Sequence, residues 1–215
     1  MLAPATRTRL LGISLSTVLA IGIAPAVYAA DHESTSIEVH GGTVTFDAST
    51  NVSAISVHGK SSALEGHARV RQTEQGLAIE AVEASVPVST LATGMGLRDS
   101  HMRKYVFTTA DGQLPDVKLD AGHAVCSPAS SHDMTCQLSG NLEIRGVLRP
   151  FTVALKVSES GGTFRAAGDA DVKLSAYQIE RPSQLGVQTA DEVKLHLEFT
   201  GRPAANMTAV NRGGQ

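Results

Sequence analysis

The chain has 215 residues, a length that suits one domain, and 42% of them are hydrophobic, as in an ordinary globular protein. A net charge of −3 argues against a nucleic-acid binder, and the lack of Trp removes the usual surfaces on which bases and sugars stack. Two Cys are too few for a disulfide framework or for an all-cysteine zinc site.

Residues 1–29 have the composition of a secretory signal peptide. Arg7 and Arg9 precede a run of apolar and small residues, 10–26, and small residues end the segment. An uncleaved membrane anchor is the alternative, but the run is shorter than the ~20 residues that span a bilayer and Pro25 interrupts it. We therefore expect cleavage after residue 29 and a periplasmic or secreted product, in a compartment where disulfides form.

From residue 30 to residue 200, apolar and polar residues alternate in short segments. A period of two predicts half-buried antiparallel strands, and about eight such segments are typical of a sandwich or a barrel. The alternation slips by one residue between Ile79 and Val82, which moves the following side chains to the other face of the sheet unless a β-bulge absorbs the slip. Turns are predicted at Gly41-Gly42, Asn51, Gly59, Gly76, Gly146 and Gly161-Gly162.

Two long segments interrupt the strand pattern. In residues 89–105, Leu97, His101 and Lys104 fall on one helical face, and the glycines near the start favour a short or partly 3₁₀ helix. Residues 176–188 contain Pro182, which forbids a regular helix through their centre. Long crossings of this kind often form lids or binding loops. The last segment, 201–215, lacks an apolar pattern and is predicted to be a disordered tail.

The apolar positions of the strands include many small residues, and large rings are scarce. An eight-stranded barrel is just wide enough either to fill itself or to hold a small ligand. Small inward side chains favour a cavity, whereas close packing by Leu, Val and Ile from facing strands would fill the interior. The small residues are Gly66, Ala68, Ala84, Gly140, Ala166, Gly168 and Ala170.

Common catalytic motifs are missing, since neither Gly-x-Ser-x-Gly nor His-Glu-x-x-His occurs. His58, His101 and Asp99 are the candidate acids or bases, and they would have to meet in one cavity to act together. A structural role is the simpler interpretation of Asp99, which we expect to order backbone amides of the first crossing. We therefore predict no catalytic residue.

The two cysteines lie close to two histidines along the chain. His123, Cys126, His132 and Cys136 could together bind zinc or copper. A disulfide is the simpler interpretation, because Cys126 and Cys136 flank a polar turn and could face each other across a hairpin. Such a bridge would stabilise the fold by about 2–3 kcal/mol in the chain-entropy model. We predict the disulfide and no metal site.

Four groups of residues resemble, in the same order, those of the YceI-like family of exported bacterial proteins. They are Ile55-Ser-Val-His58 followed by Gly66; residues 88–94 with Arg98-Asp99-Ser-His101-Met102; residues 138–150; and Leu174-Ser-Ala-Tyr177-Gln-Ile179 followed by Asp191-Glu-Val193. The resemblance covers about residues 36–200 of the sequence. Four motifs in order are more specific than any one of them alone.

The resemblance implies an all-β fold, an antiparallel eight-stranded barrel of lipocalin-like appearance with one or two short helices in the crossings. It assigns residues 30–200 to this barrel domain. It also implies that a long apolar molecule is held inside the barrel, such as a polyisoprenoid, a quinone tail or a fatty amide. The expected partner is this apolar lipid, with no cofactor other than the bound isoprenoid or quinone, no nucleic acid and no transmembrane segment after signal removal; a homodimer is left open.

Three functions follow from these patterns. The first is a periplasmic protein that binds or sequesters an isoprenoid or similar lipid, with residues 91–102 and 179–187 covering the cavity. The alternatives are an enzyme acting on a lipid or quinone, and a stress-related scaffold without a ligand. Alternation along the strands and the place of the first crossing give the expected ligand-binding residues: Val86, Leu97, His101, Met102, Leu142, Ile144, Phe151, Val153 and Leu195.

Overall fold

Eight long antiparallel strands form the body of the protein, and the computed structural model describes residues 33–74, 76–130 and 133–204. A two-residue strand, β8 (Ser183–Gln184), precedes the last long strand. The long strands are β1 (Thr35–Thr50), β2 (Ser56–Thr73), β3 (Gly76–Val86), β4 (Val117–Pro128), β5 (Asp133–Ile144), β6 (Val147–Ser160), β7 (Thr163–Lys173) and β9 (Val187–Pro203).

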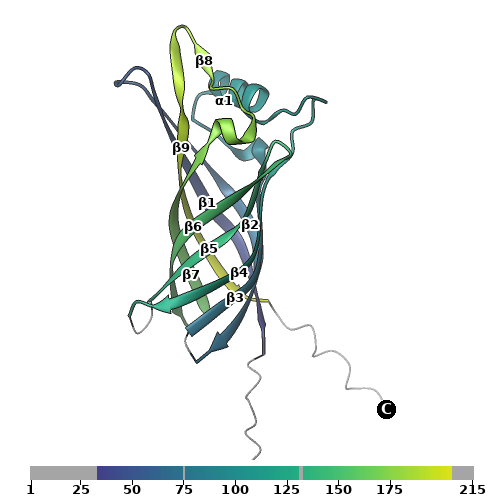
Figure 1. The fold of residues 1–215 in the computed structure, drawn as a ribbon, viewed down its shortest axis with the longest axis vertical. Helices are drawn as coiled ribbons and strands as arrows, with labels where there is room; N and C mark the ends of the chain where they lie inside the picture. Colours follow the sequence, from purple (N-terminus) through teal and green to yellow (C-terminus); the bar gives the residue numbers. More distant parts are fainter. Residues whose placement is uncertain (1–32, 75, 131–132, 205–215) are drawn as a thin grey trace, which may run out of the picture. The chain divides into compact units, whose positions relative to one another are not determined.

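The strands close into a barrel (Figure 1). Neighbouring strands pair in sequence order from β1 to β7, and β9 pairs with both β7 and β1. Leu197 of β9, for example, lies opposite Val44 on one side and Gly168 on the other. Every pairing among the described strands is antiparallel, so the predicted fold class is confirmed, and each long strand pairs with a neighbour on each side over at least part of its length.

The two ends of the barrel differ in structure (Figure 1). At the end that we call the mouth lie the β1–β2 and β5–β6 turns, the helix α1 (Gly96–Met102) and the hairpin formed by β8 and β9. At the opposite end, which we call the disulfide end, lie the β2–β3, β4–β5 and β6–β7 turns. The described chain also begins and ends there, since β1 starts and β9 finishes at the disulfide end.

Cys126 of β4 and Cys136 of β5 are bonded to each other, as predicted. The two residues are direct partners in the β4–β5 register, with their Cα atoms 4.1 Å apart, and both are fully buried. The bridge uses both thiols, which removes them from any metal site with His123. The fourth residue of that alternative, His132, lies outside the described residues.

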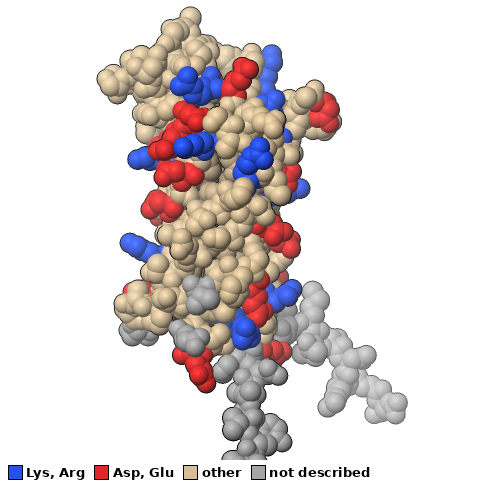
Figure 2. All heavy atoms as spheres, in the orientation of Figure 1, with Lys and Arg blue, Asp and Glu red and all other residues tan. Residues whose placement is uncertain are grey.

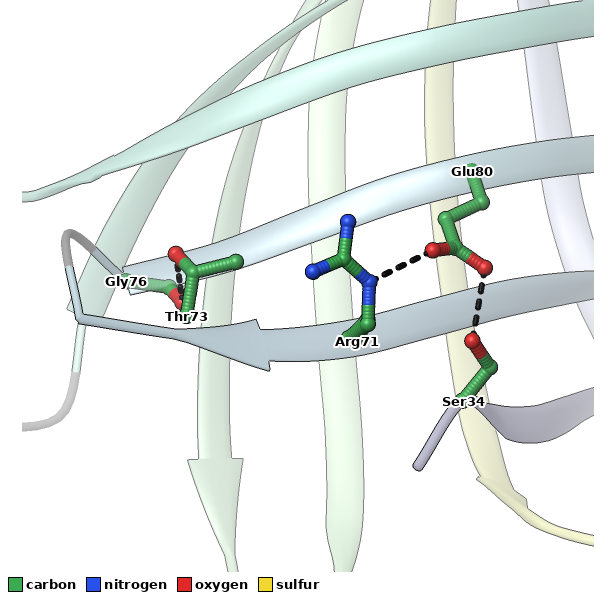
Figure 3. Close-up of polar contacts among 5 residues, drawn as sticks. All are labelled: Ser34, Arg71, Thr73, Gly76 and Glu80. Atoms are coloured by element: carbon green, nitrogen blue, oxygen red, sulfur yellow. Dashed lines mark hydrogen bonds and ion pairs between the residues drawn. The ribbon is translucent and has the colours of Figure 1, made fainter. Parts of the chain in front are cut away.

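A β-bulge absorbs the slip in the alternation of β3. Opposite Arg69 and Val70 of β2, strand β3 contains one additional residue, Glu80. The Glu80 carboxylate accepts hydrogen bonds from Arg71 Nε and from Ser34 Oγ, both at 2.7 Å (Figure 3). These bonds, chiefly the one from Arg71, lower the pKa of Glu80 below its ordinary value. The bulge therefore ties the residue before β1 to the β2–β3 hairpin.

Two of the predicted turns are wrong. Gly41-Gly42 and Gly59 lie inside β1 and β2, because these strands are longer than the alternation suggested. Gly41 has a φ of 71° and lies where the β1–β2 register shifts, so the glycine pair forms a bulge within a continuous strand. The turn at Gly76 is confirmed, and Thr73 Oγ1 donates to the Gly76 carbonyl at 2.8 Å (Figure 3).

The predicted tail begins too early, because β9 continues through residues 201–203. These residues remain ordered because they pair with β1, where Gly201 lies opposite Val39. Residues 205–215 of the tail and the predicted signal peptide, 1–29, lie outside the described residues. Within the described ranges, no helix is long and apolar enough to cross a bilayer.

The first crossing, between β3 and β4, contains the predicted short helix. A 3₁₀ turn, Val88–Thr90, is followed by α1 and by one turn of π-helix, Arg103–Phe107. The second crossing, between β7 and β9, contains a 3₁₀ turn, Leu174–Tyr177, and no regular helix passes through Pro182. Both crossings lie at the mouth, where they can cover the barrel interior.

The small residues of the strands do not surround an open space, in contrast to what we predicted from them. Of the seven, only Ala84 borders the cavity described below, whereas Ala166 and Ala170 are buried in the packed core. The glycines allow neighbouring strands to approach closely. A Cβ at Gly140 would overlap the Asp120 carbonyl oxygen and lie 2.6 Å from Ala121 Cα. Small size at these positions therefore permits tight packing of the wall.

This close approach predicts the effect of an added methyl group. Gly140→Ala should lower the free energy of unfolding by about 1–3 kcal/mol, because backbone atoms of β4 cannot move without breaking the ladder. Gly122→Ala is the matched control, since Gly122 lies in the neighbouring strand with no atom within 4 Å of the added Cβ. Urea unfolding of both variants checks the prediction, and equal stabilities would contradict it.

Candidate ligand-binding cavity

The mouth half of the barrel contains a cavity of about 1070 Å³. All eight long strands contribute to its wall, and both crossings contribute to its cover. Ligand pockets usually have volumes of ~300–1,000 Å³, so this cavity is slightly larger than that range. The cavity is therefore large enough for an extended apolar molecule.

The wall follows the alternation of the strands. In β1, for example, Val44, Phe46 and Ala48 face the cavity at every second position, and Val193, Leu195 and Leu197 do so in β9. None of the strand residues in the wall carries a charge. Apolar side chains on all sides make the interior a poor environment for water and a good one for a hydrocarbon chain.

The cavity does not extend through the whole barrel. In β5, Leu142 and Ile144 line it, whereas Leu138 belongs to the packed core nearer the disulfide. In β6, Phe151 lines it, but Val153 and the two inward residues that follow are closely packed. The disulfide half is thus filled by its own side chains, and the mouth half is hollow. Both interpretations of the interior from the sequence are therefore correct, each for one half.

A carboxylate fixes the conformation of each crossing. In the first, Asp99 of α1 accepts hydrogen bonds from the Thr93 amide at 2.7 Å and from Thr93 Oγ1 at 2.6 Å. Asp99 is buried, and these bonds, the hydroxyl first, lower its pKa below the ordinary value. The expected structural role of Asp99 is confirmed: it holds the loop before α1 against the helix.

The second crossing uses the same device, which the sequence analysis missed. Asp191 of β9 accepts hydrogen bonds from the Ser175 amide at 2.8 Å and from Ser175 Oγ at 2.7 Å, and these bonds lower its pKa. Arg149 Nε donates to the Ala176 carbonyl at 2.7 Å from the other side. The sequence signal for this anchor is an Asp just before the apolar alternation of the last strand. The signal does not identify the partner, because Ser175 lies 16 residues earlier in the chain.

Among the residues that line the cavity, all the charged ones lie in its cover. These are Arg98 of α1 and Glu180 and Arg181 of the second crossing. His101 also lines the cavity, and its ring contacts the edge of the Tyr105 ring, with the centroids 5.6 Å apart. The site is therefore apolar in its depth and polar only near its opening, which suits a molecule with a long apolar part and a small polar head.

The predicted ligand-binding residues converge on this cavity with one exception. Val153 lies outside the lining, because it packs in the filled half of the barrel. The other predicted residues all border the cavity: Val86, Leu97, His101, Met102, Leu142, Ile144, Phe151 and Leu195. Further residues line the cavity that were not predicted, among them Phe46, Val57, Phe107, Leu174, Ile179 and Val193.

The three candidate acids and bases do not come together. His101 borders the cavity, but Asp99 is engaged with Thr93. His58 does not line the cavity; its imidazole is exposed, with Nδ1 bonded to the Asp47 carboxylate and Nε2 2.6 Å from Ser56 Oγ. The arrangement that the enzyme hypothesis required is therefore absent from these residues.

A second depression, of about 860 Å³, lies on the outer side of β1 to β5. Its lining includes five carboxylates, Glu38, Glu65, Glu83, Asp120 and Glu143, together with Lys118. Charged side chains would lose hydration if they were covered by hydrocarbon. This outer depression is therefore unsuited to an apolar chain, and the interior cavity is the better candidate.

Residues 28–201 match the family described as YceI-like domain. Among solved structures, a polyisoprenoid binding domain from Saccharophagus degradans has a TM-score of 0.60 at 15% identity, covering 79% of this chain and 99% of that one. Burkholderia cenocepacia BcnA has a TM-score of 0.55 at 18% identity, covering 74% and 95%. A Campylobacter jejuni YCEI protein has a TM-score of 0.52 at 14% identity, covering 69% and 85%. At these identities the likeness concerns the fold.

The search of curated proteins gives no significant match. The family assignment therefore comes from the match of residues 28–201 to the family, and the solved structures show that the three-dimensional fold is shared as well.

The division of the interior predicts different costs for two leucines of β5. Leu138→Ala should lower the free energy of unfolding by about 2–5 kcal/mol, because it opens a void in the packed half. Leu142→Ala should cost clearly less, because its side chain borders space that is already empty. Chemical denaturation of both variants checks this, and equal losses would argue that the mouth half is closely packed as well.

The lowered pKa of Asp99 predicts a pH dependence. The ionised carboxylate stabilises the fold above its ordinary pKa of 3.8, and this contribution is lost as the pH falls through the lowered pKa of the folded state. Asp99→Asn should therefore reduce stability by about 1 kcal/mol at pH 6 and much less at pH 3. Thermal unfolding at several pH values measures the difference; a constant gap between wild type and variant would contradict the assignment.

Proposed function

The chain belongs to the YceI-like domain family, and from this premise we propose that it is an exported protein that binds a long apolar lipid inside its barrel. The preferred ligand is an isoprenoid or a similar long-chain molecule, including the tail of a quinone. Its role is to carry or sequester that molecule, with no catalytic step.

One observation carries the proposal: a cavity of about 1070 Å³ whose strand residues are all uncharged and mostly apolar. Burial of apolar surface contributes roughly 0.8 kcal/mol per methylene group, so a long chain gains affinity with each unit that enters. An empty apolar cavity of this size is otherwise a cost to stability. A protein that only needs a stable scaffold would be expected to fill it.

The polar groups at the opening support an orientation for the ligand. Arg98, His101 and Arg181 lie in the cover, whereas Leu142 and Phe151 lie in the wall below. A polar head therefore stays near the crossings, and the apolar tail extends toward the packed half. The solved polyisoprenoid binding domain from Saccharophagus degradans shares the fold, which is consistent with this class of ligand.

An extracytoplasmic location is part of the proposal. The Cys126–Cys136 disulfide suits an oxidising compartment, and residues 1–29 have the composition of a signal peptide. A lipid in such a compartment must cross water between membranes, and a protein cavity shields it during that passage.

Native mass spectrometry of the protein purified from the exporting cell, followed by organic extraction, tests the proposal. We expect a bound species with the mass steps of an isoprenoid. Leu142→Trp should weaken the uptake of an added octaprenyl lipid by at least about tenfold, because the larger side chain enters the cavity. Leu148→Trp, an exposed residue outside the cavity lining, is the control. A protein that carries no lipid and takes up none would overturn the proposal.

A further inference from the structure

The exposed apolar side chains of the protein gather at one end of the barrel. Among the side chains that the structure describes, every large apolar one that is exposed belongs to the mouth half. Six of these form a rim around the opening, which we call the apolar rim: Val52, Ile55, Met95, Leu97, Tyr105 and Leu185. Scattered surface apolar residues are common, but confinement to one end calls for an explanation.

Leu185 is the most exposed member of the rim, with 97% of its surface accessible. It lies at the tip of the β8–β9 hairpin, where Leu185 and Gly186 have φ values of 52° and 80°. Two consecutive positive φ angles define a turn in which Asn or Asp normally precedes Gly. A leucine at this position is unfavourable because its backbone adopts a positive φ and because its apolar side chain is exposed to water. The stability of the turn and of the fold therefore does not explain why a leucine is found here.

The hairpin that carries Leu185 is joined to the β1–β2 turn, which carries Val52 and Ile55. The backbone N–H of Asn51 donates to the backbone carbonyl of Gln188 at 3.0 Å. The Asn51 side-chain oxygen, Oδ1, accepts a hydrogen bond from the backbone N–H of Gln188 at 2.8 Å. Neither segment contains a charged residue from position 48 to 57 or from 182 to 190. Figure 2 shows the result: the two projections at the top of the molecule are free of red and blue.

Basic residues lie behind these uncharged tips. The segments 87–116, 145–149 and 174–186 together contain six Lys and Arg against four Asp and Glu, whereas the whole chain has 18 against 21. One of the four acids, Asp99, is buried against Thr93. Lys104 lies 5.2 Å from the centre of the exposed Tyr105 ring, a pair typical of the boundary between lipid headgroups and acyl chains.

We propose that the apolar rim docks on the surface of an anionic phospholipid bilayer. Leu185, Val52 and Leu97 enter the boundary between headgroups and acyl chains, and the basic residues of the crossings and of the β5–β6 turn face the phosphates. No helix is required for this contact, because the hairpin tips supply the apolar groups.

The position of the rim connects the docking surface to the cavity. Ile55, Met95, Leu97, Tyr105 and Leu185 are exposed and line the cavity as well. An apolar path therefore runs from the membrane surface to the interior, along which a lipid could leave the bilayer without crossing water. This use of the docking surface rests on the proposed function, whereas the docking itself does not.

Flotation of the protein with ligand-free vesicles of phosphatidylethanolamine and phosphatidylglycerol tests the proposal. We expect Leu185→Asn to weaken binding by about tenfold, because the tip loses its apolar group. The variant cannot be dismissed as misfolded, since Asn-Gly is the preferred sequence for this turn. Val52→Ser should weaken vesicle binding by about threefold. The wild-type protein should bind the vesicles less strongly in high salt, and it should bind vesicles of phosphatidylcholine alone less strongly as well.

Leu148→Asn is the control, because Leu148 is exposed on the outer wall and lies in the outer depression. Its binding should equal that of wild type. Equal flotation of the Leu185 variant and wild type would overturn the docking proposal, as would a rim that joins two copies of the chain, seen as a dimer that Leu185→Asn dissociates. The vesicles contain no isoprenoid, so a failed lipid-uptake experiment would leave this result intact. Val52 does not line the cavity, so Val52→Ser should take up detergent-dispersed octaprenyl lipid normally.

Discussion

The pairing of β9 with β1 is the constraint on which the rest of the structure depends. It joins residues near the two ends of the described chain, as in Ile37 opposite Pro203 and Val44 opposite Leu197. Closure gives every long strand a neighbour on each side and directs every second side chain into a common interior. Without it, residues such as Val44 and Leu195 would lie on an open sheet, and no enclosed space would exist.

Closure creates an interior, and side-chain size decides how it is used. Toward the disulfide end, Leu138, Val153 and Leu155 belong to one buried cluster with the Cys126–Cys136 bridge, and this half supplies the dense core that stabilises the domain. Toward the mouth, inward side chains leave about 1070 Å³ unfilled. The protein thus separates stability from binding along the barrel axis, so the hollow half can keep a cavity without losing the fold.

The crossings complete the site, and each is fixed by the same kind of interaction. Asp99 binds the amide and hydroxyl of Thr93, and Asp191 binds those of Ser175. Both carboxylates have lowered pKa values because these bonds favour the ionised form. Such anchoring holds the backbone of each crossing in place while its apolar side chains, such as Leu97 and Leu185, remain exposed at the mouth.

The pattern of residues along the chain predicted most of the strands, the disulfide and part of the cavity wall, and it located the slip in β3 that a bulge absorbs. Alternation is a local property, and in a barrel with one interior it assigns residues such as Leu142 and Leu195 to the inner side wherever the strands pair. It could not show that Leu142 borders a cavity while Val153 is packed, because that depends on the distance across the barrel. Nor could it pair Asp191 with Ser175 or join Asn51 to Gln188, since residues distant along the chain meet only after closure. The small residues misled for the same reason: the backbone of a neighbouring strand, known only from the tertiary structure, decides whether a glycine faces a space or a close contact.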